Sequence, residues 1–587
     1  MIDAGASYGL RLSWKCSQIL RRSRTLPSDL YLPAQPAFPD NVAGSSLNLK
    51  FQWETMKALF AVRTTLVAAS LTVCAFMAGC GAAGSTPSSS LTGGSVTGTQ
   101  NPLVAMYTIR TGCPAGQIMV EFGPTSSYGR STAWSAPSPY YSSVLVAGMK
   151  ASTTYHMRAQ VQCSTGNRTT STSPDTTFTT GPLPSSSLVF PQLVVSRPNP
   201  SLTSTENPGI EYIDVIVANS PAIFTDRDGN PIWYYDTGPG NFAFPFKLLP
   251  NGNMLVSITD GVTRSTLREI DLAGNTIREM TTPALQKKMA NAESFDFVPW
   301  GFTHDFAMLP NGHVVAIVNC YKNFTNLPGY PGTKLVQGNA LVDLDQNWNP
   351  VWAWNSFDHL DVNRHLDGLP DWTHSNALLY SPDDGNLILS MRNQSWILKL
   401  DYNNGAGAGN ILWTLGYQGD FALTNEGVPS DDPSLWFSNQ HFPVILSHNG
   451  SQTTLGIFDN GDQRILNTGG AQCRSPLADN GSPICYSRPV IFQIDESSII
   501  ANIAWADPLP EFSIWGGAIN QFANGNVEFQ MNDPAVPPSP NLGSEVQEVT
   551  GTSTPQAVWQ MNVFPAPGNV YRAYRFPSLY NGVTWQY

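Results

Sequence analysis

Residues 306–318 are Phe-Ala-Met-Leu-Pro-Asn-Gly-His-Val-Val-Ala-Ile-Val, two apolar runs separated by Asn311-Gly312. Asn-Gly is favoured in two-residue hairpin turns, because both of its residues tolerate positive φ angles. Apolar runs on both sides of such a turn predict an antiparallel hairpin of buried strands. A turn of this kind, Asn-Gly or Asp-Gly after an apolar run, occurs five times; the turns begin at Asn251, Asn311, Asp384, Asn449 and Asn524.

The turns recur at intervals of 60, 73, 65 and 75 residues, so the hairpin belongs to a larger repeat. Several units carry a second strand-and-turn pattern further on, at 267–275, 340–348 and 396–403. Four strands in a unit of this length are typical of a β-propeller blade. Residues 222–233 form a sixth, partial unit, which the run at 570–576 could complete so that the ring closes. We therefore predict an all-β fold with a six-bladed β-propeller over residues 190–587, with seven blades as the open alternative.

A smaller domain precedes the repeats. Short alternating runs between residues 102 and 182 predict a small β-sandwich. Glu121-Phe-Gly-Pro and the later Thr154-Tyr-His-Met-Arg-Ala resemble fibronectin type III modules of secreted enzymes. Residues 81–101, rich in Gly, Ser and Thr without apolar periodicity, predict a flexible tether.

The N-terminal segment has the layout of an export signal. Met56-Lys57 begins a basic stretch, an apolar run covers residues 64–77, and small residues precede Cys80. This run is too short for a convincing transmembrane helix and predicts a signal peptide over residues 56–80. Met77-Ala-Gly-Cys80 resembles a bacterial lipobox, so we predict a lipid anchor on Cys80 and a periplasmic or cell-surface location; a plain cleaved signal remains the alternative. We interpret residues 1–55 as upstream sequence from a mis-assigned start.

Composition narrows the function classes. Only 13% of the 587 residues are charged, with 49 Gly and 46 Pro, which disfavours long charged helices and coiled coils. The net charge of −12 argues against nucleic acid as a partner. Since an exported chain meets an oxidising compartment, cysteines there can pair. We predict a Cys473–Cys485 bridge, Cys113 and Cys163 could also pair, and none of the eight cysteines has zinc-site spacing.

The register of the repeat identifies candidate site residues. The first strand of a propeller blade lines the central channel, so residues seven to ten positions before the turn lie at one channel mouth. His304, His374 and His441 occupy that position in three consecutive units. The chain has eight histidines in all, so this coincidence favours a shared site over three unrelated packed residues. Phe244 and Trp515 lie at comparable offsets in the flanking units.

An arginine joins the three histidines in this prediction. Arg392 follows the second strand of the His374 unit, and that strand returns antiparallel to the mouth where the first one began. A guanidinium matches two oxygens of a sulfate, phosphate or carboxylate, and imidazole can act as nucleophile, base or acid. Three histidines could also hold zinc, but the arginine would repel a cation. The cluster therefore favours chemistry on an anionic group.

Sequence motifs around these four residues resemble those of a known protein family. They are Thr303-His-Asp-Phe-Ala-Met-Leu-Pro-Asn-Gly, Asp371-Trp-Thr-His-Ser-Asn-Ala and Ser390-Met-Arg-Asn-Gln-Ser, with Asn439-Gln-His-Phe as a fourth. Together they resemble bacterial aryl-sulfate sulfotransferases over roughly residues 205–587. The resemblance implies a six-bladed propeller after an N-terminal β domain. It also implies transfer of a sulfuryl group from a phenolic sulfate ester to a phenol, with no nucleotide donor or other cofactor.

Residue roles follow from the same resemblance. His441 corresponds to the nucleophile, which becomes a sulfohistidine, and His304 to the acid and base. His374 and Arg392 match the groups that hold the sulfuryl oxygens. Two half-reactions at one site imply ping-pong kinetics. Phe442 departs from the family pattern, in which a small or polar residue is more usual after the nucleophile.

Two other functions stay open at this point. A metal-dependent hydrolase could use the three histidines as ligands. A non-catalytic propeller could bind an anionic glycan, with Trp372 and Trp515 as stacking platforms. The sequence does not reveal the natural donor and acceptor or the oligomeric state.

Overall fold

The computed structural model describes residues 91–586, apart from 113–114, 137–140, 165–169, 217–218, 262–264, 293, 474–484, 533–542 and 565–568. The proposed upstream segment, the signal peptide, Cys80 and residues 81–90 of the tether therefore lie outside the described residues, as does Cys113 of the Cys113–Cys163 pair. Residues 88–587 form one compact unit. No helix in the described part of this unit is long and apolar enough to cross a membrane.

Two antiparallel sheets make up the first part of this unit. One contains β1 (Ser95–Gly98), β2 (Ala105–Arg110) and β5 (Tyr141–Val146). The other contains β3 (Gly116–Gly123), β4 (Arg130–Ser131), β6 (Thr154–Cys163), β7 (Thr170–Thr172) and β8 (Thr176–Thr179). Every second side chain of β6 is buried, as expected of strands with one face on a core. The tether prediction is wrong for residues 95–98, because β1 pairs with β2.

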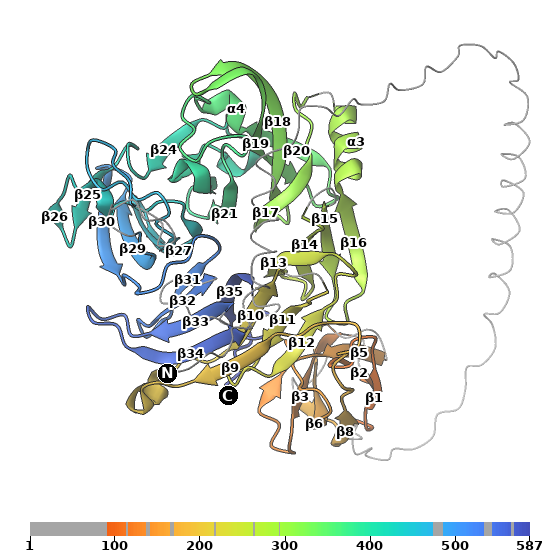
Figure 1. Cartoon of the computed structure of the whole chain (residues 1–587). Helices are drawn as coiled ribbons and strands as arrows, with labels where there is room; N and C mark the ends of the chain where they lie inside the picture. The colour runs from red at the N-terminus through yellow and green to blue at the C-terminus, as the bar shows by residue number, and fades with distance from the viewer. Residues whose placement is uncertain are drawn as a thin grey trace, which may run out of the picture. The chain divides into compact units, whose positions relative to one another are not determined.

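Six sheets follow, and Figure 1 shows them succeeding one another from gold through green to blue. The first contains β10 (Ile210–Val215), β11 (Ala222–Thr225), β12 (Pro231–Tyr235) and β35 (Val570–Phe576). The second contains β13 (Phe242–Leu248), β14 (Met254–Thr259), β15 (Ser265–Ile270) and β16 (Thr276–Thr281). The third contains β17 (Gly301–Met308), β18 (Val314–Leu327), β19 (Tyr330–Leu344) and β20 (Pro350–Asn355).

The other three sheets complete the array. The fourth contains β21 (Ser375–Ser381), β22 (Asn386–Met391), β23 (Trp396–Leu400) and β24 (Ile411–Leu415). The fifth contains β27 (His441–Asn449), β28 (Gln452–Asp459), β29 (Arg488–Asp495), β30 (Ile500–Ala506), β25 (Ala422–Asn425) and β26 (Val428–Pro429). The sixth contains β31 (Ala518–Gln521), β32 (Val527–Asn532), β33 (Ser544–Val549), β34 (Ala557–Phe564) and β9 (Gln192–Ser196).

Helices are short and lie between strands. They are α3 (Thr282–Ala292), α4 (Ser356–His359) and the 3₁₀ helices η2 (Pro200–Thr205), η3 (Arg392–Gln394), η4 (Asn403–Gly405) and η5 (Pro433–Leu435). The chain is thus nearly all β, and the all-β prediction is confirmed.

The five Asn-Gly and Asp-Gly turns join the first and second strands of sheets two to six, as their sequence predicts. The second strands β14, β22 and β32 are buried along nearly their whole length, because each sheet is covered on both faces by its neighbours. The first strands of successive sheets contact one another, and β35 contacts both β31 and β13. We interpret this arrangement as a propeller, whose blade count remains a prediction.

Two strands exchange between the ends of the array. The C-terminal β35 pairs with β10 of the first sheet, while β9, which precedes that sheet in the chain, pairs with β34 of the sixth. The first and last sheets therefore each contain a strand from the opposite end of the chain.

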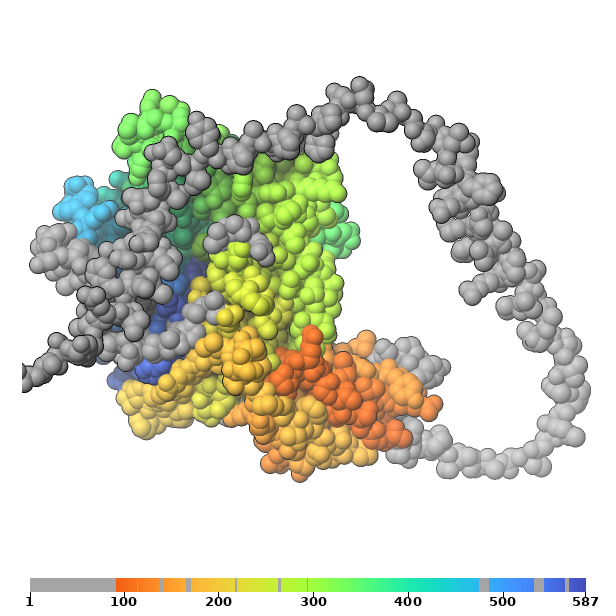
Figure 2. All heavy atoms as spheres, turned by 45° about the vertical axis from the view of Figure 1, so that its right-hand side comes forward, coloured from red at the N-terminus to blue at the C-terminus, as the bar shows by residue number. Residues whose placement is uncertain are grey.

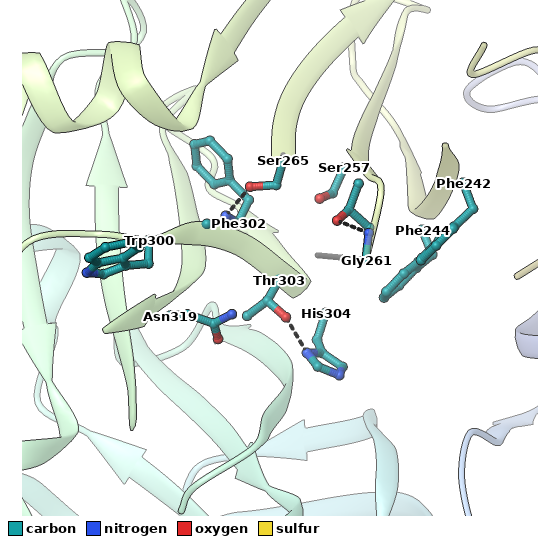
Figure 3. A pocket seen from close by; sticks show the side chains of 12 residues that line it. Phe242, Phe244, Ser257, Gly261, Ser265, Trp300, Phe302, Thr303, His304 and Asn319 are labelled. Carbon is teal, nitrogen blue, oxygen red and sulfur yellow. Dashed lines mark hydrogen bonds between the residues drawn. The ribbon is translucent and has the colours of Figure 1, made fainter. Parts of the chain in front are cut away.

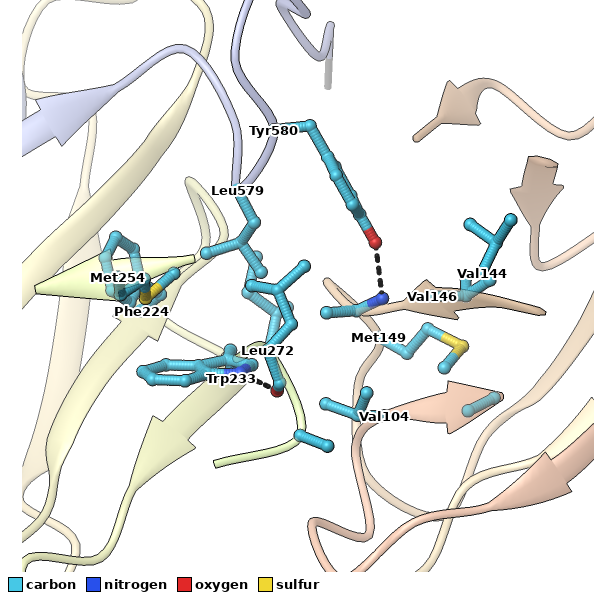
Figure 4. Packing of buried hydrophobic residues seen from close by; sticks show 14 of the residues in the cluster. Val104, Val144, Val146, Met149, Phe224, Trp233, Met254, Leu272, Leu579 and Tyr580 are labelled. Atoms are coloured by element: carbon cyan, nitrogen blue, oxygen red, sulfur yellow. Dashed lines mark hydrogen bonds between the residues drawn. The ribbon is translucent and has the colours of Figure 1, made fainter. Parts of the chain in front are cut away.

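The sandwich shares a hydrophobic core with the first two sheets. Val104 and Met149 belong to one buried cluster with Trp233 and Leu272, and the C-terminal Trp585 is buried in the same cluster (Figure 4). The Tyr580 hydroxyl accepts a hydrogen bond from the Ala147 backbone N–H, 2.8 Å away. Figure 2 shows the orange sandwich packed on the gold part of the chain.

Candidate active site

Irregular backbone at the start of three first strands positions the three histidines. The pairing register shifts between Phe302 and Phe306 in β17, between Ser375 and Ala377 next to His374, and between His441 and Val444 in β27. His304 and His374 have φ angles of +50° and +47°. Non-glycine residues adopt such angles only where the surrounding structure enforces them, and they concentrate at functional sites.

Two of the three imidazoles contact one tyrosine, and the third contacts one of those two. The ring centroids of His304 and His374 are 4.7 Å apart. Tyr571 of β35 lies 5.7 Å from the His304 ring and 5.7 Å from the His441 ring. Residues from the first, third, fourth and fifth sheets therefore meet at one point, where the prediction from the register places the three histidines.

The tautomer of His441 follows from its hydrogen bonds. The Asn460 amide nitrogen donates to the carbonyl oxygens of Ser513 and Gly516, at 2.8 and 3.0 Å, so its oxygen faces His441 Nδ1, 2.7 Å away. That oxygen can only accept, so Nδ1 carries the proton and Nε2 carries a lone pair. The Gly516 backbone N–H donates to Nε2 at 3.3 Å, in agreement with this tautomer.

Both His304 and His441 are held neutral. Burial lowers the pKa of His304 well below its usual value, and the charges of His374 and Arg572 lower it further. Burial also lowers the pKa of His441 well below its usual value, with Arg392 as the next largest cause. His304 Nδ1 lies 2.5 Å from the Thr303 hydroxyl (Figure 3). The site thus holds two uncharged imidazoles beside two guanidinium groups.

His374 has a carboxylate partner. Its Nδ1 lies 2.5 Å from Asp371 Oδ2, which orients the ring. Burial raises the pKa of Asp371, but the charges of His374 and Arg392 outweigh it and bring that pKa below its usual value. The Arg392 backbone N–H donates to the His374 carbonyl oxygen at 3.1 Å, which ties η3 to the start of β21.

Arg392 is held by aspartate side chains from two loops. Nη2 lies 2.6 Å from Asp462 Oδ2, and Nη1 lies 3.0 Å from Asp367 Oδ2. Burial raises the pKa of Asp462 to about 8 even though the Arg392 charge lowers it. The sequence predicts that Asp367 belongs to a polar loop at the entrance but gives no sign of Asp462, and both reach Arg392 from other parts of the chain.

An aromatic cavity of about 200 Å³ opens beside His304. Phe242 and Phe244 stack nearly parallel with their centroids 5.8 Å apart, and Phe244 meets His304 edge-on at 6.1 Å. Phe302 and the exposed Trp300 also line the cavity (Figure 3). The walls suit a flat aromatic group whose reactive end faces His304.

A family model decides the identity. The arylsulfotransferase (ASST) model matches residues 205–572, which include His304, His374, Arg392 and His441. The chain belongs to the arylsulfotransferase family. This membership makes it a sulfotransferase in general terms, in agreement with the resemblance of its motifs. The matched residues end at Arg572 and do not include the sandwich, for which the fibronectin type III resemblance remains a prediction.

Comparisons with other known proteins add little to the family assignment. None of the curated proteins matches this chain. Among solved structures, a Bacteroides caccae protein of unknown function has a TM-score of 0.38 and 10% identity, covering 62% of this chain and 98% of its own. A mutant Synechocystis apocarotenoid oxygenase has a TM-score of 0.32 and 11% identity, covering 80% and 95%. At TM-scores this low, neither similarity indicates the fold or the function of this chain.

Asn460 and Tyr571 lie in the candidate site, and the sequence interpretation missed both. Asn460 directly follows β28, just as Arg392 directly follows β22, so the repeat register contained the signal for it. Tyr571 lies in β35, where no histidine or turn marks the position. Arg572, fully buried beside it, pairs with Asp305 at 3.4 Å and lowers the pKa of both His304 and His441.

Two observations concern the alternative functions. Among the described residues, no group of three or more His, Cys, Asp or Glu side chains is arranged to hold a metal ion. Trp372 cannot be an exposed stacking platform, because it is buried and stacks on Phe357. Its burial corrects that part of the glycan-binding hypothesis.

A disulfide supports the turn that carries two site residues. Cys473 and Cys485 are bonded, as predicted. Cys473 Sγ lies 3.3 Å from the Gly461 carbonyl oxygen, and Cys485 Sγ lies 3.5 Å from that of Asp462. The bridge thus packs against the turn that contains Asn460 and Asp462. Cys320 is a buried free thiol, and burial raises its pKa to about 12.

Proposed function

We propose that this chain transfers a sulfuryl group from a phenolic sulfate ester to a phenolic acceptor, through a sulfohistidine on His441. The observation that carries the proposal is the neutral His441 imidazole, whose Nε2 lone pair is oriented by Asn460. A buried imidazole with a lowered pKa keeps Nε2 unprotonated at neutral pH, and attack requires that the Gly516 N–H, which donates to Nε2 at 3.3 Å, give up that hydrogen bond. Membership in the arylsulfotransferase family supports the group transferred.

In the first half-reaction, His441 Nε2 attacks sulfur. A nitrogen–sulfur bond forms, the bond from sulfur to the phenolic oxygen breaks, and that oxygen takes a proton from His304. The aromatic cavity beside His304 supports the placement of the aryl group there. The lowered pKa of His304 belongs to the site without a substrate, and a bound sulfate ester raises that pKa because its negative charge favours the imidazolium.

The sulfuryl oxygens need cationic donors as the transfer proceeds. Arg392 and His374 supply them in this proposal, in line with the Arg392 charge acting on His441 and the 4.7 Å contact of His374 with His304. In the second half-reaction, an acceptor phenol loses its proton to His304 and attacks the sulfur on His441. Donor and acceptor use the same site in turn, so the kinetics are ping-pong.

Export of the protein is part of the proposal. The Cys473–Cys485 bridge supports an oxidising compartment, since such bridges are rare in the cytosol. A lipid anchor on Cys80 rests on the sequence alone.

The test is detection of the covalent intermediate. Incubation with 4-nitrophenyl sulfate and no acceptor should add one sulfuryl group to the intact protein, and peptide mapping should locate that acid-labile group on His441. The control His441→Asn should bind donor without a burst of nitrophenolate. Full turnover with no covalent adduct at any time would rule out the proposed intermediate.

A further inference from the structure

One loop carboxylate lies where three donors converge. Asp367 Oδ2 accepts from Arg392 Nη1 at 3.0 Å and lies 3.4 Å from Asn439 Nδ2. Asp367 Oδ1 accepts from Gln463 Nε2. Asp367 belongs to the connection between β20 and β21, whereas the three donors lie in or next to other elements. The Asp367 carboxylate thus lies in a cradle formed by Arg392, Asn439 and Gln463, which come from separate parts of the chain.

The cradle lies next to the proposed nucleophile. Asn439 is buried and lies two residues before His441. Gln463 is in the turn that holds Asn460, the partner of His441 Nδ1. Arg392 is the largest charge acting on the His441 pKa. The three donors that hold Asp367 therefore belong to segments that carry His441, bind its Nδ1 or act on its pKa.

We propose that Arg392, Asn439 and Gln463 form an oxyanion subsite for the sulfate ester, which Asp367 occupies as an internal anion until the substrate displaces it. The identity of the ligand rests on the proposed function, while the oxyanion class rests on the donors themselves. Cationic and amide N–H groups that bind one carboxylate in this way also match the oxygens of a sulfate. Asn439 and Gln463 thereby become substrate-binding residues.

Displacement needs little rearrangement. The Asp367 side chain is 26% exposed, so rotation about its χ1 angle can carry the carboxylate into solvent. The rest of the loop is anchored: the Arg364 guanidinium lies 3.5 Å above the Trp396 ring and donates to Gln394. Arg392 keeps its contact with Asp462 after Asp367 leaves. The loop can therefore remain in place while its carboxylate turns out.

If Asp367 and sulfate compete for the same three donors, removing the Asp367 charge should strengthen sulfate binding. Asp367→Asn keeps the size of the side chain and removes its charge, and Asp367→Ala removes the group. Both should tighten binding of inorganic sulfate to the full-length protein about tenfold, because a charged competitor for three hydrogen bonds is gone. Isothermal titration with sodium sulfate measures this directly, and thermal melting confirms that each variant is folded.

Two further variants provide a control in the same loop and a test of one donor. Asp361→Asn lies in the same loop, where its carboxylate accepts from Asn363, and should leave sulfate affinity unchanged. Gln463→Ala in the Asp367→Asn background should weaken sulfate binding about fivefold, since one donor is lost. Unchanged, weaker or undetectable sulfate binding in both Asp367 variants would overturn the inference. Because this equilibrium measurement needs no transfer, tighter sulfate binding without a sulfohistidine would refute the proposed function alone.

Discussion

Replacing Asn460 with alanine should slow sulfation of His441 without unfolding the protein. The variant removes the oxygen that accepts from His441 Nδ1 at 2.7 Å in a fully buried setting. The Nδ1 proton then has no acceptor, so the tautomer with an unprotonated Nε2 is favoured only by the hydrogen bond from the Gly516 N–H. In addition, the imidazole gains positive charge as the nitrogen–sulfur bond forms, and the Asn460 oxygen no longer stabilises that charge.

The magnitude follows from the cost of an unsatisfied buried donor, about 1–3 kcal/mol. Because about 1.4 kcal/mol corresponds to a factor of ten in rate, the first-turnover rate constant should fall roughly fivefold to 150-fold. Stopped-flow release of nitrophenolate from 4-nitrophenyl sulfate, before any acceptor is added, measures this step.

The Asn460→Asp variant tests the same role of Asn460 by adding a negative charge instead of removing the acceptor. Its carboxylate can still accept from Nδ1, but its charge favours the imidazolium and raises the pKa of His441. Since the nucleophile must be neutral, the acidic fall in burst rate should move to higher pH. Asn386→Ala is the matched control: it removes acceptors for the Tyr402 and Asn403 backbone N–H groups at the other end of the fourth sheet. An unchanged burst rate in Asn460→Ala, with the protein still folded, would refute the orienting role of Asn460.

Two other predictions follow from the site. His304→Asn should slow turnover of an unactivated phenyl sulfate about 10²-fold or more but slow that of 4-nitrophenyl sulfate much less, because nitrophenolate leaves without a proton; equal losses for both donors would contradict an acid role. Asp462, whose pKa burial raises to about 8, should ionise above that pH and place a second negative charge beside Arg392, so the KM for the donor should rise there. Asp462→Asn stays neutral and should flatten this part of the KM profile, and a rise that persists in the variant would assign it to another group.

The sequence predicts most of the architecture because its strongest signals are local. Asn-Gly and Asp-Gly turns specify hairpins without help from distant residues, and the spacing of His304, His374 and His441 from those turns places them at equivalent points of three sheets. Strand β1 was missed because Ser95–Gly98 has no apolar pattern and depends on pairing with β2.

The missed site residues depend on contacts far apart in the chain. Tyr571 reaches His304 because β35 returns to the first sheet, and Asp367 reaches Arg392 from the loop before β21. The loop residues around Trp372 cover that side chain, which no local pattern indicates. Long-range packing of this kind leaves no periodic signal in the sequence.

The exchange of strands between the ends of the array sets an order of assembly. The first sheet lacks β35 until residues 570–576 dock on β10, and Tyr571 arrives on that same strand. The second, third and fourth sheets each take all their strands from one continuous stretch of chain, whereas the first sheet and the cluster of aromatic and imidazole rings need a strand that lies more than 300 residues further on. Formation of the site is therefore tied to docking of β35, and products truncated before residue 570 should be inert.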